Sequence, residues 1–293
     1  MHRAADKQIG HKIRFIYCHF FVSAINAFRY AKKNNVPLFV ATGESDIPIP
    51  NKPFRRFTFE EFRNYTSGVI AVSSKNKKEA TELGLIDPKK CQLSPNGTDL
   101  TMFHPMDRKM CREKLGFPQD VFIVSCVGFI CERKGQNRLL DAVRRLGNQN
   151  QKLIFLGKSA VMESFVIEGD EILFKGAAEN KDIPTYLCAS DVFCLPTRAE
   201  GCCNAVIEAL ACGLPVISSN LPFNWDVLDN NNSIMVNPDN VEEIATAIDK
   251  LYKDKLLREK LKKGVQAKSN SLGIKQRADS IMHFIQDKLY PLR

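Results

Sequence analysis

The feature that most limits the fold of this chain is the regular alternation of short apolar runs with amphipathic stretches. The run Val121–Ile130 is almost continuously apolar, which is typical of a strand covered on both faces of a sheet. The next stretch places Leu139, Leu140, Val143 and Leu146 on one helical face. This alternation predicts an α/β fold with parallel sheets. The predicted strands are Ile13–Cys18, Pro37–Ala41, Gly68–Ser73, Cys91–Ser94, Val121–Phe129, Lys152–Leu156, Glu171–Phe174, Val192–Leu195, Pro215–Ser218 and Ser233–Val236.

A domain boundary is predicted between residues 100 and 116. With 293 residues, the chain has room for one large or two medium domains. Asn96 and Gly97 form a turn signal, Pro105 follows, and Asp107 can cap a short helix that ends at Leu115. The last helix is predicted from Ile274 to Leu289.

The charge of the chain changes at the same place. The net charge is +9, and residues 1–115 carry 20 Lys or Arg against 11 Asp or Glu, whereas the remainder carries 22 of each kind. An asymmetry of this size points to an anionic partner or surface for the first part. No helix-turn-helix, zinc or RNA-binding motif accompanies the basic residues, so nucleic acid is not the expected partner.

The ten cysteines and the hydropathy pattern indicate the compartment. The cysteines follow no C-x-x-C spacing and are interpreted as reduced core residues, with a disulfide or zinc framework as the alternative. The segment Met1–Lys12 is polar and lacks the apolar region of a signal peptide. The run Phe15–Phe28 is too short and too polar to cross a bilayer. A cytoplasmic protein is expected, free or at the inner face of a membrane.

Two loops follow predicted strands at the edge where parallel α/β sheets bind their ligands. The first loop contains Arg133 and Lys134 directly before a helix, and it is either a solvated basic turn or an anion site. The second precedes the helix Ala205–Ala211, which is apolar on nearly every side and therefore buried.

That second helix carries Glu208, and a buried carboxylate requires a partner. The partner is either an internal Arg or Lys or the hydroxyl groups of a ligand. Glu200 lies eight residues earlier, and the segment 201–204 offers backbone N–H groups at a positive helix end. Cations, donors and carboxylates together suit a ligand that carries both phosphate and sugar hydroxyls.

At these residues the chain resembles glycosyltransferase family 4, the retaining GT-B enzymes that use nucleotide sugars. The E-x7-E signature of the family is met by Glu200–Glu208 and continues through Ala209–Val216. Gly128–Gly135 is similar to the Gly-Arg-Leu-x-x-x-Lys-Gly segment, and Pro95–Asp99 to the Pro-Asn-Gly-x-Asp segment before the inter-domain linker. Ala71–Ser73 is similar to the strand that precedes the Pro-Asn-Gly-x-Asp segment.

The resemblance implies a role for each matching residue. Glu208 resembles the glutamate that binds the ribose hydroxyls, and Glu200 the one that contacts the donor sugar. Lys134 resembles the lysine that holds the pyrophosphate. Gly176 and Ala177 fall where the backbone of the family meets the base. The backbone amides expected at the sugar or phosphate are those of Gly201, Cys202, Cys203 and Asn204.

The chain departs from the family at two places. Phe129 replaces the arginine that precedes the lysine by five positions, and Arg133 is the candidate to supply the lost charge. Thr42–Ser45 stands where many members carry a His-Gly pair, so Glu44 or Ser45 either faces the acceptor or belongs to an ordinary turn.

The resemblance also implies a GT-B fold with two Rossmann-like parallel-sheet domains. Only four predicted strands precede residue 100, so the N-terminal domain is expected to be incomplete, without its first strand and glycine-rich loop. The predicted divisions are residues 1–105 on the acceptor side, 106–273 for the nucleotide sugar, and 274–293 as a helix that crosses back toward the N-terminal domain.

The implied activity is transfer of a sugar from a nucleotide-diphosphate sugar to an acceptor hydroxyl with retention. The acceptor is expected to be a glycan or a lipid-linked glycan of the cell-surface polysaccharide type. No cofactor or metal is expected, because no Asp-x-Asp signature is present. The alternatives are a truncated non-catalytic nucleotide-sugar-binding protein and a GT-B sugar-nucleotide epimerase.

The basic residues of the first part then become candidates to meet anionic lipid or a lipid-diphosphate acceptor; a merely solvated basic face is the alternative. The candidates are Lys12, Arg14, Arg29, Lys32, Lys33, Arg55, Arg56, Lys75, Lys77 and Lys78.

Overall fold

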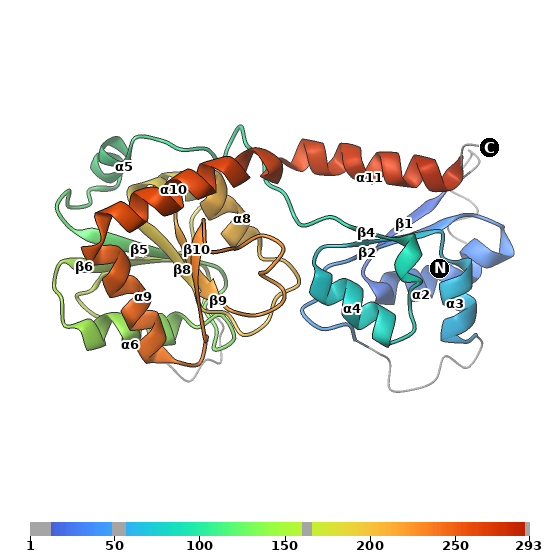
Figure 1. The fold of residues 1–293 in the computed structure, drawn as a ribbon, viewed down its shortest axis with the longest axis horizontal. Coiled ribbons are helices and arrows are strands. Elements are labelled where there is room, and N and C mark those ends of the chain that lie inside the picture. The colour runs from blue at the N-terminus through green and yellow to red at the C-terminus, as the bar shows by residue number, and fades with distance from the viewer. Residues whose placement is uncertain (1–12, 49–56, 160–165, 291–293) are drawn as a thin grey trace. The chain divides into compact units, whose positions relative to one another are not determined.

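A computed structural model describes residues 13–48, 57–159 and 166–290 (Figure 1). Three of the basic candidates, Lys12, Arg55 and Arg56, lie outside these residues. The chain forms two compact units. The first comprises Met1–Pro95, Glu200–Cys202 and Arg277–Arg293, and the second comprises Asn96–Ala199 and Cys203–Gln276. Each unit contains one parallel sheet, and all ten predicted strands are present with small shifts at their ends.

The first unit is a four-stranded sheet in the order β1-β2-β3-β4, covered by helices on both faces. Alternate residues of β2 explain this layering: Leu38 and Val40 pack with α2, α3 and α4, whereas Phe39 and Ala41 pack with α11. The strands are β1 (Ile16–His19), β2 (Leu38–Thr42), β3 (Gly68–Ala71) and β4 (Cys91–Leu93). The helices are α2 (Phe21–Lys33), α3 (Phe59–Tyr65), α4 (Ser74–Glu82), the 3₁₀ turn η1 (Pro88–Lys90) and α11 (Ile274–Leu289), whose first three residues belong to the second unit.

The second unit is a six-stranded parallel sheet in the order β10-β9-β8-β5-β6-β7. The strands are β5 (Phe122–Val127), β6 (Gln151–Leu156), β7 (Ile172–Gly176), β8 (Val192–Leu195), β9 (Val216–Ser219) and β10 (Ser233–Val236). The order reverses between β5 and β8, so the chain diverges there in opposite directions. Ligands of open α/β sheets bind outside the carboxyl ends of the strands at such a point. The sheet therefore places the loops after β5 and β8 at the expected site.

The helices of the second unit pack in pairs around this sheet. Helix α6 contacts α9, α5 contacts α7, and α8 contacts α10. Asp107 caps α5 by accepting a hydrogen bond from Met110 N, as predicted. The helices are α5 (Arg108–Leu115), α6 (Gln136–Leu146), α7 (Ile183–Ala189), α8 (Asn204–Ala211), α9 (Val241–Lys253), α10 (Lys255–Ser269) and the 3₁₀ turn η2 (Asn270–Leu272).

The burial of most cysteines agrees with their interpretation as core residues. All ten cysteines lie among the described residues, none forms a disulfide, and all are buried except the partly exposed Cys91 and Cys131. Burial raises the pKa of the Cys126 thiol to about 12, so this side chain is a neutral core residue. Over residues 13–48, 57–159 and 166–290, no helix is both long and apolar enough to cross a membrane.

Candidate functional site

The loop after β5 brings Lys134 to the carboxyl edge of the second sheet. Gly128 N donates to Leu156 O at 2.8 Å, and the backbones are so close that a Cβ on Gly157 would lie 2.0 Å from Gly128 O. The Lys134 side chain lies beside Gly128, where an added Cβ would be 3.5 Å from its Cε atom. Its Nζ atom is 4.0 Å from the Sγ atom of Cys203. The lysine predicted to hold a pyrophosphate therefore lies at the beginning of α8.

Helix α8 is buried except along one stripe. Six of its eight residues are buried, whereas Asn204 is exposed and Glu208 is partly exposed. These two residues are four positions apart and therefore share a face of the helix. The side chain of Cys203, at the N-cap, makes no capping hydrogen bond. The first turn of α8 thus keeps N–H groups that the cap side chain does not satisfy.

Glu208 carries a carboxylate for which the described residues supply no hydrogen bond and no ion pair. Burial raises the pKa of this carboxyl above its ordinary value, since removal from water disfavours the charged form. Of the two alternatives left open by the sequence, the internal Arg or Lys partner is therefore not found. The carboxylate keeps its acceptor capacity for another molecule.

Arg133 ties the loop after β5 to the loop after β8. Its guanidinium donates to the carbonyl of Ala199, and its own carbonyl accepts a hydrogen bond from Arg198 N at 2.9 Å. Arg198 in turn donates to Glu132 Oε1 at 2.8 Å and to Asp239 Oδ1 at 2.6 Å. Three loops at this edge are thereby cross-linked. The assignment of Arg133 to the phosphate remains a prediction.

The remaining predicted residues of the second unit lie at the same edge. Gly176 ends β7, its carbonyl accepts a hydrogen bond from Gly157 N at 2.8 Å, and Ala177 follows it. Phe129, at the position of the family arginine, is 50% exposed. An apolar ring therefore stands where the family has a cation, five positions before Lys134.

Besides Gly176 and Ala177, the structure brings five predicted residues of the second unit to this edge of the sheet: Arg133, Lys134, Cys203, Asn204 and Glu208. The other loop residues, Glu200, Gly201 and Cys202, are buried and group with the first unit.

Glu44 is held inside the first unit. Its Oε1 atom accepts a hydrogen bond from Phe21 N at 2.8 Å, at the start of α2. Its Oε2 atom accepts hydrogen bonds from Thr42 Oγ1 at 2.6 Å and from Gly43 N at 2.8 Å. Both carboxylate oxygens are thus engaged in holding the turn after β2, as the ordinary-turn interpretation requires. Sequence alone gave no signal for this link to α2.

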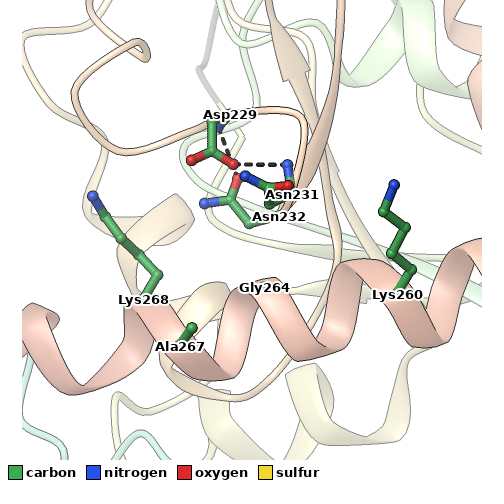
Figure 2. Close-up of a pocket in the computed structure, with 7 residues that line it drawn as sticks. All are labelled: Asp229, Asn231, Asn232, Lys260, Gly264, Ala267 and Lys268. Atoms are coloured by element: carbon green, nitrogen blue, oxygen red, sulfur yellow. Dashed lines mark hydrogen bonds between the residues drawn. The ribbon is translucent and has the colours of Figure 1, made fainter.

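A pocket of about 430 Å³ lies away from this edge, between α10 and the turn before β10 (Figure 2). Lys260 and Lys268 line it, but the turn satisfies its own polar groups: Asn231 N donates to Asp229 Oδ1 at 2.7 Å, and Asp229 N donates to Asn232 Oδ1 at 3.0 Å. The pocket lies at the amino end of β10, which is the end of the sheet opposite to the ligand edge. We therefore do not assign it to the site.

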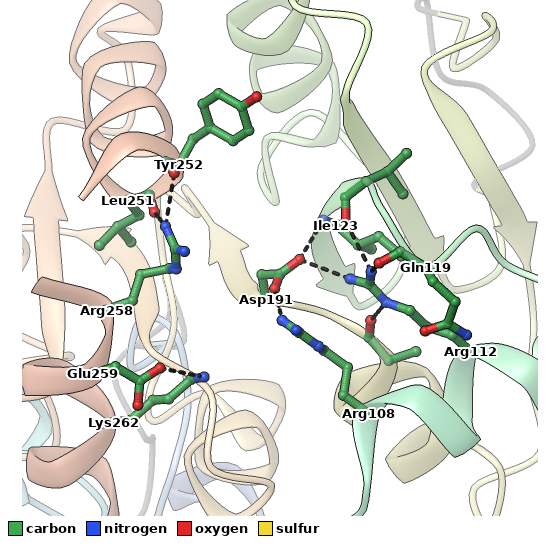
Figure 3. Close-up of polar contacts among 12 residues, drawn as sticks. Arg108, Arg112, Gln119, Ile123, Asp191, Leu251, Tyr252, Arg258, Glu259 and Lys262 are labelled. Carbon is green, nitrogen blue, oxygen red and sulfur yellow. Dashed lines mark hydrogen bonds and ion pairs between the residues drawn. The ribbon is translucent and has the colours of Figure 1, made fainter. Parts of the chain in front are cut away.

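The amino edge of the same sheet holds a buried ion pair (Figure 3). Arg112 is only 1% exposed, and it donates to Asp191 Oδ2 at 2.8 Å and to the carbonyls of Ala189, Gln119 and Val121 at 2.8–2.9 Å. Asp191 also accepts from Ile123 N at 2.9 Å and pairs with Arg108. Burial lowers the pKa of Arg112, and the charge of Asp191 opposes that shift. This cluster fastens α5 to the strands β5 and β8.

The basic face of the first unit is partly neutralised by its own carboxylates. Lys32 pairs with Glu61 at 3.1 Å, and Lys75 and Lys78 pair with the glutamates four positions later on α4. For Arg29, Lys33 and Lys77 no ion pair is found within the described residues. The part of the chain that the structure describes also holds no group of three or more His, Cys, Asp or Glu that could bind a metal.

Comparisons with known proteins give the class and then the family. HepE of Anabaena, solved in complex with UDP, matches with a TM-score of 0.81 at 20% identity, over 97% of this chain and 81% of HepE. Sucrose-phosphate synthase from Thermosynechococcus elongatus matches with a TM-score of 0.79 at 21% identity, over 98% of this chain and 76% of that one. The two parallel-sheet units thus have a GT-B fold.

Residues 107–268 match the family described as glycosyl transferases group 1. The chain belongs to this family. One relative, the putative teichuronic acid biosynthesis glycosyltransferase TuaC of Bacillus subtilis, is 27% identical over 240 residues, covering 80% of this chain and 60% of TuaC. Another, the Escherichia coli UDP-Gal:alpha-D-GlcNAc-diphosphoundecaprenol alpha-1,3-galactosyltransferase, is 28% identical over 236 residues, covering 74% and 59%. The chain spans about 60% of the length of these two relatives.

Proposed function

We propose that this chain transfers a sugar from a nucleotide-diphosphate sugar to an acceptor hydroxyl, with retention of configuration. The observation that carries the proposal is Glu208, a carboxylate on the one polar stripe of a buried helix with no hydrogen-bond or ion-pair partner among the described residues. A partly buried acceptor group without a protein partner costs free energy, and the hydroxyls of a ribose supply the donors that it lacks.

The beginning of α8 suits the diphosphate of the same donor. The leaving diphosphate gains negative charge as the glycosidic bond breaks. Lys134 and the first amides of α8, near Cys203 and Asn204, supply positive charge close to it. Gly176 and Ala177 then meet the base, and Glu200 with the amides of Gly201 and Cys202 meets the transferred sugar. No metal is needed where fixed cations neutralise the diphosphate.

The acceptor is a glycan or a lipid-linked glycan. The relatives named above support this class, since one is named for teichuronic acid biosynthesis and the other for a diphosphoundecaprenol acceptor. The cations Arg29, Lys33 and Lys77 of the first unit, for which the described residues supply no ion pair, also suit an anionic lipid or a lipid diphosphate. Sedimentation with phosphatidylglycerol vesicles at low salt tests the membrane part; absence of co-sedimentation would remove it.

The first test of the proposed function is calorimetric titration with UDP, GDP and ADP. One of them is expected to bind, and the corresponding nucleoside monophosphate is expected to bind more weakly because it offers less charge to Lys134. If no diphosphate binds, Glu208 and Lys134 do not form a nucleotide site. The titration also identifies the base.

The second test follows release of the nucleoside diphosphate from nucleotide sugars in the presence of lipid-linked acceptors. Release that requires the acceptor, with an α-linked product from an α-linked donor, is expected. Binding without release would contradict the transferase activity and would favour the non-catalytic binding protein. A changed sugar on the nucleotide, without transfer, would instead favour an epimerase.

A further inference from the structure

In the segment Pro95–Asp99, each of the last three residues has a structural role. Thr98 N donates to Leu272 O at 2.8 Å, and Ile274 N donates to Thr98 O at 2.9 Å. Gly97 lies so close to this second segment that a Cβ would be 3.0 Å from Leu272 O. Asp99 holds the next turn by accepting hydrogen bonds from Thr101 N and Oγ1 at 2.8 and 2.7 Å, which lowers its pKa.

Asn96 is different, because its side chain reaches a residue 108 positions away. Its Nδ2 atom donates to Asn204 Oδ1 at 2.8 Å. Asn204 is the first residue of α8 and is exposed on the same face as Glu208. This contact lies inside the second unit and reaches the edge at which Lys134 lies.

The contact fixes which way the Asn204 amide points. A carboxamide has an acceptor oxygen on one side and a donor NH₂ group on the other. Because Oδ1 accepts from Asn96, the Nδ2 group is the part left for other partners, and the described residues give it no other hydrogen bond. Without Asn96 the amide can turn over and direct its oxygen to the ligand instead.

We propose that Asn96 is a positioning residue that holds the Asn204 side chain with its NH₂ group toward the diphosphate of the bound donor. The inference rests on the proposed function, since the ligand of this edge is taken to be a nucleoside diphosphate. The NH₂ group of Asn204 then donates to the diphosphate together with Lys134 and the amides of α8. In this proposal Asn96 acts on the bound diphosphate through Asn204.

Two substitutions of Asn96 separate positioning from a merely structural contact. Asn96→Ala frees the Asn204 amide and is expected to weaken binding of the nucleoside diphosphate by about 3- to 10-fold, the effect of one hydrogen bond. Asn96→Asp is expected to weaken it further, because the new carboxylate accepts from the Asn204 NH₂ group and turns the amide oxygen toward the phosphates. The thermal midpoints of both variants should stay close to that of the wild type.

A double substitution tests whether the two asparagines act as one unit. Asn96→Ala combined with Asn204→Ala is expected to bind no more weakly than Asn204→Ala alone, since Asn96 then has nothing to position. Asn230→Ala removes an exposed asparagine from the turn before β10 and serves as the matched control, with unchanged affinity. In turnover assays, the Asn96 variants should raise KM for the donor more than they lower kcat.

The measurements are made by calorimetry on the full chain with whichever of UDP, GDP and ADP the wild type binds. If the wild type binds but Asn96→Asp is equal to or tighter than Asn96→Ala, the positioning role is overturned while the proposed function stands. Additive effects of the two alanine substitutions would overturn it as well. If the wild type binds none of the three nucleotides, both proposals fail together.

Discussion

The two edges of the second sheet contain similar residue types but use them in opposite ways. At the amino edge, Arg112 and Asp191 are buried and saturate each other and the surrounding backbone. At the carboxyl edge, Glu208 is only partly removed from water, and the described residues give its carboxylate no partner. The charged groups of the amino edge are therefore satisfied within the protein, whereas the Glu208 carboxylate at the carboxyl edge is left for a ligand.

The partners of a charge separate structural charges from functional charges in this sheet. A buried charge with a complete set of partners is compatible with a stable fold, but removing one partner leaves the other charge buried and unpaired, at a large cost in stability. A buried charge without partners costs stability in the free protein. Substitution at the two edges should therefore change different measurable quantities, stability at one and ligand binding or turnover at the other.

The largest expected effect is at the amino edge. Arg112→Leu leaves Asp191 buried without its main cation and removes donors from three carbonyls. We expect a loss of about 3–5 kcal/mol in the free energy of unfolding, measured by urea denaturation. Arg145→Leu is the matched control, because Arg145 pairs with Glu242 on the surface at 3.1 Å; its cost should stay below about 1 kcal/mol. Equal losses in the two variants would break the comparison.

The next effect is at the carboxyl edge and concerns turnover. Lys134→Ala removes the cation beside the beginning of α8, and we expect kcat to fall about 10²-fold with little change in stability. Lys250→Ala removes the same charge from the exposed face of α9 and should leave kcat unchanged. Near-normal turnover in Lys134→Ala would refute its role at the diphosphate.

The sequence predicted the carboxyl edge better than the amino edge, for a physical reason. The candidate residues of the carboxyl edge are concentrated in two stretches of sequence, so Lys134 and the segment from Cys203 to Glu208 could be predicted from local sequence patterns. Arg112 and Asp191 are 79 residues apart in the chain, and no sequence pattern near either residue indicates that the two form a pair. The same holds for Asn96 and Asn204, which only the folded chain brings together.

The strands were predictable from their apolar runs. A strand buried on both faces needs a continuous apolar run, as in β5, and β8 and β10 have the predicted bounds. The environment of Glu208 was predictable only in part. The apolar residues of α8 itself indicated burial, whereas the lack of an Arg or Lys partner among the described residues depends on which side chains other elements place beside Glu208.

A smaller effect separates ligand binding from stability at one residue. Glu208→Gln keeps the shape but loses the charge, so we expect about a tenfold loss in nucleotide affinity by calorimetry. Because the pKa of Glu208 is raised in the folded state, its ionised form costs stability above that pKa. The cost disappears below the ordinary glutamate value of about 4.3.

The thermal midpoint of Glu208→Gln should accordingly exceed that of the wild type at pH 7.5 and match it near pH 4. Glu113→Gln, on the exposed face of α5, is the control and should change neither the midpoint nor the affinity. A lower midpoint for Glu208→Gln at pH 7.5 would mean that the carboxylate stabilises the free protein, and the contrast with Asp191 would be lost.

The smallest effect concerns the surface network that cross-links the loops of the carboxyl edge. Arg198 bridges Glu132 and Asp239, but all three side chains are substantially exposed. Exposed ion pairs contribute little because water and salt screen them. Arg198→Ala should therefore lower the free energy of unfolding by no more than about 1 kcal/mol, and less at high salt. Urea denaturation at low and high salt measures this; a salt-independent loss as large as that of Arg112→Leu would show that the carboxyl edge also depends on saturated charges for its stability.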